Sequence, residues 1–343
     1  MVSARTTNIV LDGNGLYLGN EKGCFVVKDR NHKIVEQHPL FESEINEVIL
    51  KTGNVVSTGV LATMGFWNID CMVMTSKGRP VAMLRSFDDD SHVETRLCQY
   101  EAYKDTSKAI GIMKQIIKAK IAGQNQVLRK YGLRNHPFVN DQIDALDSDS
   151  LIMARRKLMH IEGMCSTHYF SQVFQLLPIK PENKKGFKAF DGINNIFNLA
   201  YEVLAWKVHT ALLRAKLEPY LGFLHTPKHG TPSLVCDFQE LYRYLIDDFV
   251  IQYCQKLRKQ DFVLKWAIVS SNRKAKREYL NDSLTKELTQ RLDKYFKMTV
   301  EIPRIMRGDR QELETLINEE ALLFAKYLRN EIESWKPRIA SLT

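Results

Sequence analysis

The chain has 343 residues, of which 44% are hydrophobic and 26% charged, so it is long enough to fold into one large or two ordinary globular domains. No apolar run approaches the roughly 18 residues of a membrane span, and the N-terminus lacks a signal-peptide pattern. The six cysteines are scattered without a C-x-x-C pair, which argues against a zinc site or a disulfide framework and favours a reducing, cytoplasmic location.

The net charge of +9 is unevenly distributed along the chain. Residues 1–90 contain 9 basic and 11 acidic side chains, so they carry −2 and the remainder carries +11. This excess indicates that a polyanion binds the C-terminal part, although a lysine-rich solvated surface would produce the same pattern.

The N-terminal part predicts a small β-rich domain without a catalytic constellation. Short β-branched and aromatic runs alternate there with turns rich in glycine and asparagine. The expected strands are Thr7–Leu11, Leu16–Leu18, Cys24–Lys28, Lys33–Gln37, Glu47–Leu50, Trp67–Met74 and Pro80–Leu84. Ser57–Gly65 predicts one short helix, which begins with a serine cap and ends at glycine. We therefore expect a sandwich-like domain over residues 1–88.

Residues 89–343 predict a larger, all-α domain, so the expected fold class is α+β. The acidic run Asp88–Asp90 marks the boundary between the two domains. The expected helices are Val93–Tyr131, Ser150–Leu177, Ile193–Leu217, Cys236–Leu257, Asp282–Lys297 and Asp309–Trp335. The last helix would begin with a capping box formed by Asp309 and Glu312. The basic cluster Ser271–Arg277 is either a contact with a nucleic-acid backbone or a solvated helix start.

The first long helix combines an apolar face with many lysines. If DNA crosses this domain, these basic side chains are the expected phosphate contacts. They are Lys104, Lys108, Lys114, Lys118, Lys120 and Arg129.

The stretch Pro219–Arg243 offers a candidate site. His225 ends a short apolar run, a turn rich in proline and glycine follows, and then come two acids, Asp237 and Glu240. Acids three positions apart share one helical face, so both carboxylates would point toward the loop that carries His225. A histidine with carboxylates from separate elements suits a divalent metal that keeps positions open for substrate. A loop histidine without a metal role is the competing interpretation.

Two further stretches carry polar residues at helical spacing. Glu162, Ser166 and Tyr169 fall at i, i+4 and i+7 of one expected helix, so they share a face. Asn194 and Tyr201 are seven positions apart on the next helix and would also face the same way.

Together, in this order and spacing, the three stretches resemble the CRISPR-associated spacer-acquisition endonuclease and integrase family. The family's patterns appear as Glu162-Gly163 with Tyr169-Phe170, as Asp191 with Asn194 and Tyr201, and as Gly222-Phe223-Leu224-His225 followed by Ser233-Leu234, Asp237, Glu240 and Arg243. The chain departs from the family at Gly192, where the pattern has proline, and at Ala200, where it usually has glycine.

The resemblance implies a site at which Glu162, His225 and Glu240 bind Mn²⁺ or Mg²⁺ and carry the catalysis. Asp237 would orient His225 or act as a fourth ligand, and the spacing leaves open whether Asp237 or Glu240 is the primary carboxylate, with Glu240 favoured. Arg243 would meet a phosphate oxygen at the metal. The remaining family positions, expected to support the ligands or position the substrate, are Tyr169, Asn194 and Tyr201.

The resemblance also implies the reaction and the partners. The expected activity is insertion of new spacer DNA into a CRISPR array, by attack of a DNA 3′-hydroxyl on a phosphodiester. Expected partners are double-stranded and branched DNA, a second copy of the chain and a small ferredoxin-like companion protein, all in the prokaryotic cytoplasm and without a membrane. The alternative function is a non-catalytic DNA-binding scaffold. An RNA-processing helical protein is disfavoured, because the N-terminal part shows no basic and aromatic pattern for stacking bases.

Overall fold

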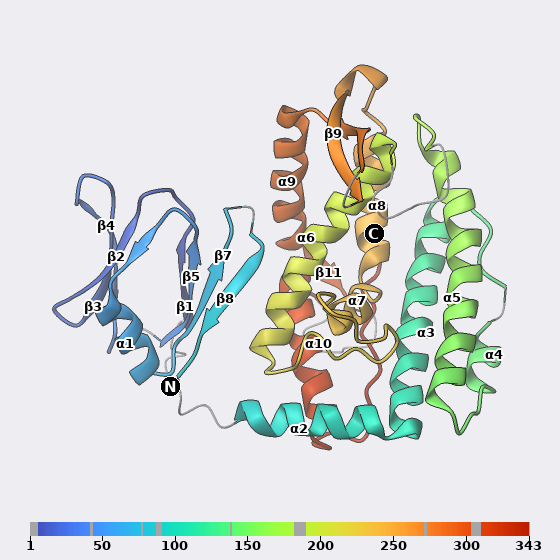
Figure 1. The fold of residues 1–343 in the computed structure, drawn as a ribbon, viewed down its shortest axis with the longest axis horizontal. Helices are drawn as coiled ribbons and strands as arrows, with labels where there is room; N and C mark the ends of the chain where they lie inside the picture. Colours follow the sequence, from blue (N-terminus) through green and yellow to red (C-terminus); the bar gives the residue numbers. More distant parts are fainter. Residues whose placement is uncertain are drawn as a thin grey trace. The chain divides into compact units, whose positions relative to one another are not determined.

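The computed structural model describes residues 6–41, 44–76, 78–86, 91–137, 139–181, 190–270, 273–302 and 310–342 (Figure 1). The chain divides into two compact units, Met1–Val93 and Glu94–Thr343. The first is built from β-sheets and the second mostly from helices, which confirms the predicted α+β fold class. No helix in the described ranges is both long enough and apolar enough to cross a membrane.

The described residues of the N-terminal unit form two four-stranded sheets and one helix. The sheets have the orders β4-β3-β2-β6 and β1-β5-β7-β8. The elements are β1 (Thr6–Leu11), β2 (Tyr17–Glu21), β3 (Cys24–Lys28), β4 (Ile34–Pro39), β5 (Glu44–Lys51), β6 (Val55–Val56), α1 (Thr58–Phe66), β7 (Asp70–Met74) and β8 (Pro80–Leu84). Ser57 caps α1 as predicted, since its side chain accepts a hydrogen bond from the N–H of Val60. The strand predicted from Trp67 begins only at Asp70, because Trp67 still belongs to the end of α1.

The helical unit contains nine named α-helices within its described residues. They are α2 (Ser91–Lys104), α3 (Thr106–Lys130), α4 (Asn140–Asp144), α5 (Leu151–Val173), α6 (Gly192–Arg214), α7 (Ser233–Gln239), α8 (Arg243–Cys254), α9 (Asp282–Phe296) and α10 (Leu313–Leu328). The single long helix predicted from Val93 to Tyr131 was wrong. Asp105 divides it, because its extended backbone ends α2 and its side chain caps α3 by accepting from the N–H of Lys108.

The helical unit also contains strands that the sequence analysis missed. β9 (Phe262–Ser270) and β10 (Arg273–Leu280) form an antiparallel ribbon, and β11 (Thr299–Glu301) pairs with β12 (Arg310–Glu312). The predicted helix start within 271–277 is therefore wrong, since its described part belongs to β10. The capping box was also wrong: Glu312 ends β12, its side chain forms no cap for α10, and Asp309 lies outside the described residues.

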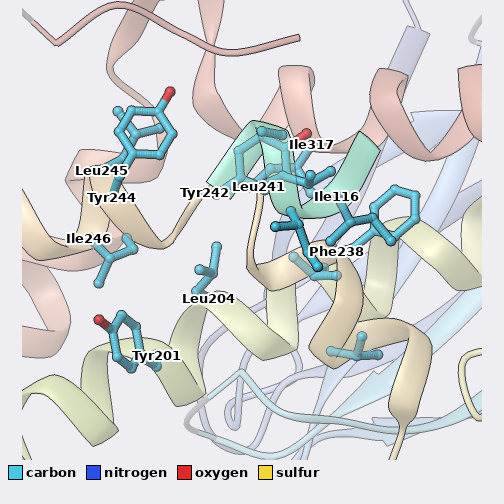
Figure 2. Close-up of a cluster of buried hydrophobic side chains, with 14 of the residues drawn as sticks. Ile116, Tyr201, Leu204, Phe238, Leu241, Tyr242, Tyr244, Leu245, Ile246 and Ile317 are labelled. Atoms are coloured by element: carbon cyan, nitrogen blue, oxygen red, sulfur yellow. The ribbon is translucent and has the colours of Figure 1, made fainter. Parts of the chain in front are cut away.

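The core of the helical unit brings distant helices together. Helix α3 packs against α5 and α8, and α6 packs against α7, α8 and α10. Figure 2 shows part of this core, with Tyr201 of α6 beneath Ile246 of α8 and Leu204 of α6 to one side of Ile246. Close approach of α3 and α8 requires glycine at 123, because a Cβ there would lie 2.4 Å from the ring of Tyr244. These contacts place residues from α3, α5, α6 and α8, and Glu240 directly after α7, around one cavity.

Candidate active site

Lys120 of α3 joins two carboxylates inside the helical unit. Its ammonium contacts Glu162 of α5 and lies 2.7 Å from Oε2 of Glu240, which directly follows α7. The hydroxyl of Ser166 donates to the same Glu162 carboxylate at 2.8 Å. Because both carboxylates touch one nitrogen, residues 162 and 240 meet here although they are far apart in sequence. They line a cavity of about 160 Å³ that Arg243 also borders.

Glu240 is buried between two cations. Arg243 Nη1 lies 2.8 Å from its Oε1, and Lys120 approaches its Oε2. Burial alone would raise the pKa of Glu240, but the charges of Arg243 and Lys120 lower that pKa to about 2. Burial likewise opposes the charge of Lys120, yet Glu240 and Glu162 raise the pKa of its ammonium. The acid and the lysine are therefore both ionised at neutral pH.

His225 and Asp237 form a second, hydrogen-bonded pair beside the first. Asp237 is completely buried, and its Oδ1 lies 2.7 Å from Nδ1 of the His225 ring. A carboxylate accepts from an N–H, so Nδ1 donates and Nε2 is the nitrogen left for another contact. Burial alone would lower the pKa of His225, but the hydrogen bond and charge of Asp237, followed by the charge of Glu240, raise it. The charge of Glu240 therefore couples the Glu240–Lys120 pair to the His225–Asp237 pair.

Asp237 also holds the loop that carries His225. Its carboxylate accepts from the backbone N–H groups of Phe223, Leu224 and His225 at 2.6, 3.0 and 2.8 Å. This wrapping requires glycine at 222, where a Cβ would lie 2.6 Å from the backbone carbonyl carbon of Ser233. The G-F-L-H pattern therefore has a physical reason: the backbone must close around one buried carboxylate.

Two buried tyrosines are tied to α8 through Asp247. The hydroxyl of Tyr169 donates to Asp247 Oδ2 at 3.0 Å, and that of Tyr201 donates to Oδ1. Burial, followed by the charge of Asp247, raises the pKa of both tyrosines well above its usual value, so they remain protonated donors. Tyr201 and Asp247 border the carboxylate cavity, and the guanidinium of Arg243 lies 4.8 Å from the Tyr201 ring centroid.

Asn194 lies at the start of α6. Its backbone N–H and its side-chain amide both donate to the Asp191 carboxylate at 2.8 Å, which makes Asp191 the N-cap of the helix. The structure thus gives Asn194 a contact within the helix cap, whereas Tyr201, seven positions later, reaches the carboxylate cavity.

Three features of the site suit a divalent metal. Glu162 and Glu240 already converge on one cation, and His225 is oriented with Nε2 unused by Asp237. Oε2 of Glu240 is buried and has no hydrogen-bond partner within the described part of the chain, although the Lys120 ammonium lies 2.7 Å away. As they stand, no three His, Cys, Asp or Glu side chains in the described ranges are close enough to hold an ion. Carboxylate and imidazole donors fit Mn²⁺ or Mg²⁺, and binding would require the Lys120 ammonium to move away.

A family model described as "CRISPR associated protein Cas1" matches residues 9–290 of this chain. The chain belongs to the Cas1 family. The resemblance identified from three ordered motifs is thereby confirmed. A CRISPR-associated endonuclease Cas1 of Pyrobaculum aerophilum is 28% identical over 263 residues, which cover 75% of this chain and 85% of that protein.

Solved structures share the fold of this Cas1 chain. A casposase bound to an integration product has a TM-score of 0.70 at 19% identity. The matched region covers 97% of this chain and 99% of the casposase chain. A chain of a partial Cas6-RT-Cas1–Cas2 complex has a TM-score of 0.73 at 18% identity and covers 99% of this chain and 100% of its own.

The structure of this Cas1 chain brings together most of the predicted site residues. Glu162, Glu240 and Arg243 border one cavity, whereas His225 lies outside its lining and is coupled to Glu240 by charge. Sequence analysis expected Lys120 to contact a phosphate if DNA crosses the domain, and it did not foresee that this side chain is buried and paired with two acids. It also missed Asp247. The signal that could have revealed the role of Lys120 was its position on the apolar face of its helix, since a lysine buried there needs an acidic partner.

Proposed function

We propose that this chain is a metal-dependent DNA endonuclease and integrase, which inserts new spacer DNA into a CRISPR array by attack of a 3′-hydroxyl on a phosphodiester. Membership of the Cas1 family, relatives named as endonucleases and the fold shared with a casposase support this function. The observation that carries the proposal is the convergence of Glu162 and Glu240 on one cation, beside a histidine that a buried aspartate orients.

In this proposal Glu162, Glu240 and His225 Nε2 hold Mn²⁺ or Mg²⁺. When bound, such an ion polarises the scissile phosphodiester and lowers the pKa of an attacking water or 3′-hydroxyl. Asp237 fixes the ring of His225, because it accepts from Nδ1 of the ring and from the backbone N–H of the same residue.

Arg243 is the residue placed to bind the substrate phosphate. It borders the carboxylate cavity and also a larger neighbouring cavity of about 820 Å³. Its buried Nε has no hydrogen-bond partner within the described residues, while Nη1 is held by Glu240. A guanidinium anchored at one end and free at another can donate to a phosphate oxygen without losing its orientation.

The partners are part of the proposal. The chain would act as a homodimer on double-stranded and branched DNA, together with a small ferredoxin-like companion protein. The similarity to a chain of a Cas6-RT-Cas1–Cas2 complex supports a protein partner, and the similarity to a casposase bound to an integration product and to a Cas1–DNA complex supports a DNA substrate. A DNA substrate of this kind places the protein in the prokaryotic cytoplasm.

Glu162→Gln tests the proposal, because it keeps the shape of the side chain and removes its charge. We expect loss of Mn²⁺-dependent joining of a 3′-hydroxyl DNA to a repeat-containing plasmid, with DNA binding in EDTA unchanged. Calorimetry should also show weaker Mn²⁺ binding by this variant. The control is Glu333→Gln, which changes an exposed glutamate outside the cavity.

Two outcomes would decide against the proposal. If the wild-type chain binds DNA but neither cleaves nor joins it with Mn²⁺ or Mg²⁺, the alternative of a non-catalytic DNA-binding scaffold is correct. If Glu162→Gln joins DNA as well as the control does, the carboxylate cavity is not the active site.

A further inference from the structure

The β9–β10 ribbon exposes an aromatic and basic face that the carboxylate site does not use. In the antiparallel register Trp266 pairs with Lys276, and Leu264 lies two residues before Trp266 on the same face. Trp266 is 69% exposed and Leu264 66% exposed. Figure 1 shows β9 at the end of the helical unit that lies away from α2. Exposed apolar side chains that gather on one face, as Leu264 and Trp266 do, mark a surface suited to contact with a partner.

The charge of the ribbon shows which chemistry it would attract. Between Phe262 and Leu280 the chain has five basic residues and one acidic residue. Lys276 Nζ lies 5.6 Å from the centroid of the Trp266 ring, and Lys274 is exposed two residues away on the same face. A polyanion with flat aromatic groups would meet both features, because its charges would pair with the lysines and its rings would stack on the tryptophan.

The base of the ribbon is fixed firmly to α6. The N–H of Gly192 donates to Glu278 at 2.8 Å, and the side-chain amide of Asn195 donates to the Glu278 carbonyl at 2.7 Å. A Cβ at Gly192 would lie 2.1 Å from the Phe262 ring, so glycine in place of the family's proline gives this chain both a donor and space for the ribbon. The exposed face is therefore a platform attached to the helix that also carries Tyr201.

We propose that the outward face of the ribbon, made by Leu264, Trp266, Lys274 and Lys276, binds an unpaired strand of DNA by stacking a base on Trp266. A duplex hides the faces of its bases, so a tryptophan gains little from it except at an open end. Single-stranded DNA presents a base face at every nucleotide and phosphates to the lysines. The inference rests on the proposed function only in taking DNA as the substrate.

The test is the binding of a fluorescein-labelled eight-nucleotide DNA to the full-length chain in EDTA, followed by anisotropy. Trp266→Ala should weaken binding about tenfold, and Trp266→Phe should restore it to within about twofold of wild type, because a ring remains for stacking. Lys276→Gln should reduce the salt dependence of binding by a slope of about 0.7. The control Tyr100→Ala, which removes an exposed aromatic ring from α2, should leave binding unchanged. Affinity for a blunt duplex should stay within about twofold in all these variants.

Several results would overturn the inference. They are single-strand binding by Trp266→Ala within twofold of wild type, tighter binding of RNA than of DNA of the same sequence, and a change of oligomeric state or of companion-protein binding without loss of DNA binding. The last result would make the ribbon a protein-docking face. Because these measurements need no metal and no reaction, they are independent of the Glu162→Gln outcome. A wild-type chain that never joins DNA would end the proposed function and leave this inference standing.

Discussion

Replacing Lys120 by methionine removes the positive charge that Glu162 and Glu240 share. Methionine has a similar length and no charge, so the main change is electrostatic rather than a cavity. Glu240 keeps Arg243 at 2.8 Å, and Glu162 keeps the hydroxyl of Ser166 and is 23% exposed on its side chain. The variant therefore leaves two negative carboxylates facing each other. The repulsion is partly offset by Arg243 at Glu240, and by Ser166 and solvent at Glu162.

The loss of unfolding free energy in Lys120→Met follows from that arrangement. Removing one partner of a buried ion pair costs about 3–5 kcal/mol, and the remaining contacts place this variant at the lower end, about 3 kcal/mol. For a folded unit the size of residues 94–343, this destabilisation lowers the melting temperature by about 6–12 °C. The matched control is Lys118→Met on the same helix, which breaks a contact with exposed Asp144 and should cost at most about 1 kcal/mol.

Scanning calorimetry in EDTA and then in Mn²⁺ measures both parts of the prediction. Since Mn²⁺ no longer has to displace an ammonium, it should raise the melting temperature of Lys120→Met more than that of wild type. The reasoning is refuted if Lys120→Met melts within about 3 °C of Lys118→Met in EDTA, which is the size of an exposed pair. It is also refuted if Mn²⁺ stabilises variant and wild type equally, because the two acids would then not share the metal.

Three other predictions follow from the same structure. Asp237→Asn, which removes the charged acceptor of His225, should weaken Mn²⁺ binding about 10- to 100-fold by calorimetry, and an affinity within twofold of wild type would contradict this. Gly222→Ala should lower the free energy of unfolding in urea by about 1–3 kcal/mol. The matched Gly163→Ala, where a Cβ meets nothing within 4 Å, should instead raise it by about 1 kcal/mol. Burial, followed by two nearby basic side chains, lowers the pKa of His136 to about 4. The neutral ring therefore contributes its full stabilisation of the fold above about pH 6.5, and this stabilisation is lost as the pH falls toward 4. Relative to His136→Phe, the wild type should lose up to about 3 kcal/mol of unfolding free energy between pH 7 and pH 4, and a pH-independent difference would show the ring is not buried as a neutral base.

Local periodicity explains which parts of the site were predictable. The spacing of Glu162 and Ser166 is a property of one helix, and the structure shows their side chains in contact. The partners of Glu162 and Glu240 across the core were not predictable in this way, because Lys120 lies 42 residues from one and 120 from the other along the chain. From sequence alone, a lysine on a helix is predicted to be exposed to solvent unless the packing of that helix is known.

The ribbon and the divided helix were missed for opposite reasons. In β10 the sequence K-A-K-R-E-Y-L alternates weakly, since basic residues occupy both faces and hide the period of two. Between α2 and α3, apolar spacing continues through Asp105, so the pattern indicates one helix although the side chain of Asp105 caps a new one. In both cases a tertiary environment decides the conformation: the base of the ribbon is bonded to α6, and Gln99 on α2 bonds the loop at Glu218 and Leu221.

Buried polar contacts between helices explain how remote side chains keep a precise arrangement. Asp247 on α8 accepts from Tyr169 on α5 and from Tyr201 on α6, so three helices share one charged acceptor. Sliding any of them by a residue would leave a buried hydroxyl or carboxylate unpaired, which costs about 1–3 kcal/mol or more. The carboxylates of Glu162 and Glu240 belong to α5 and to the turn that leads into α8. The tyrosine contacts therefore constrain the separation of the two carboxylates independently of Lys120.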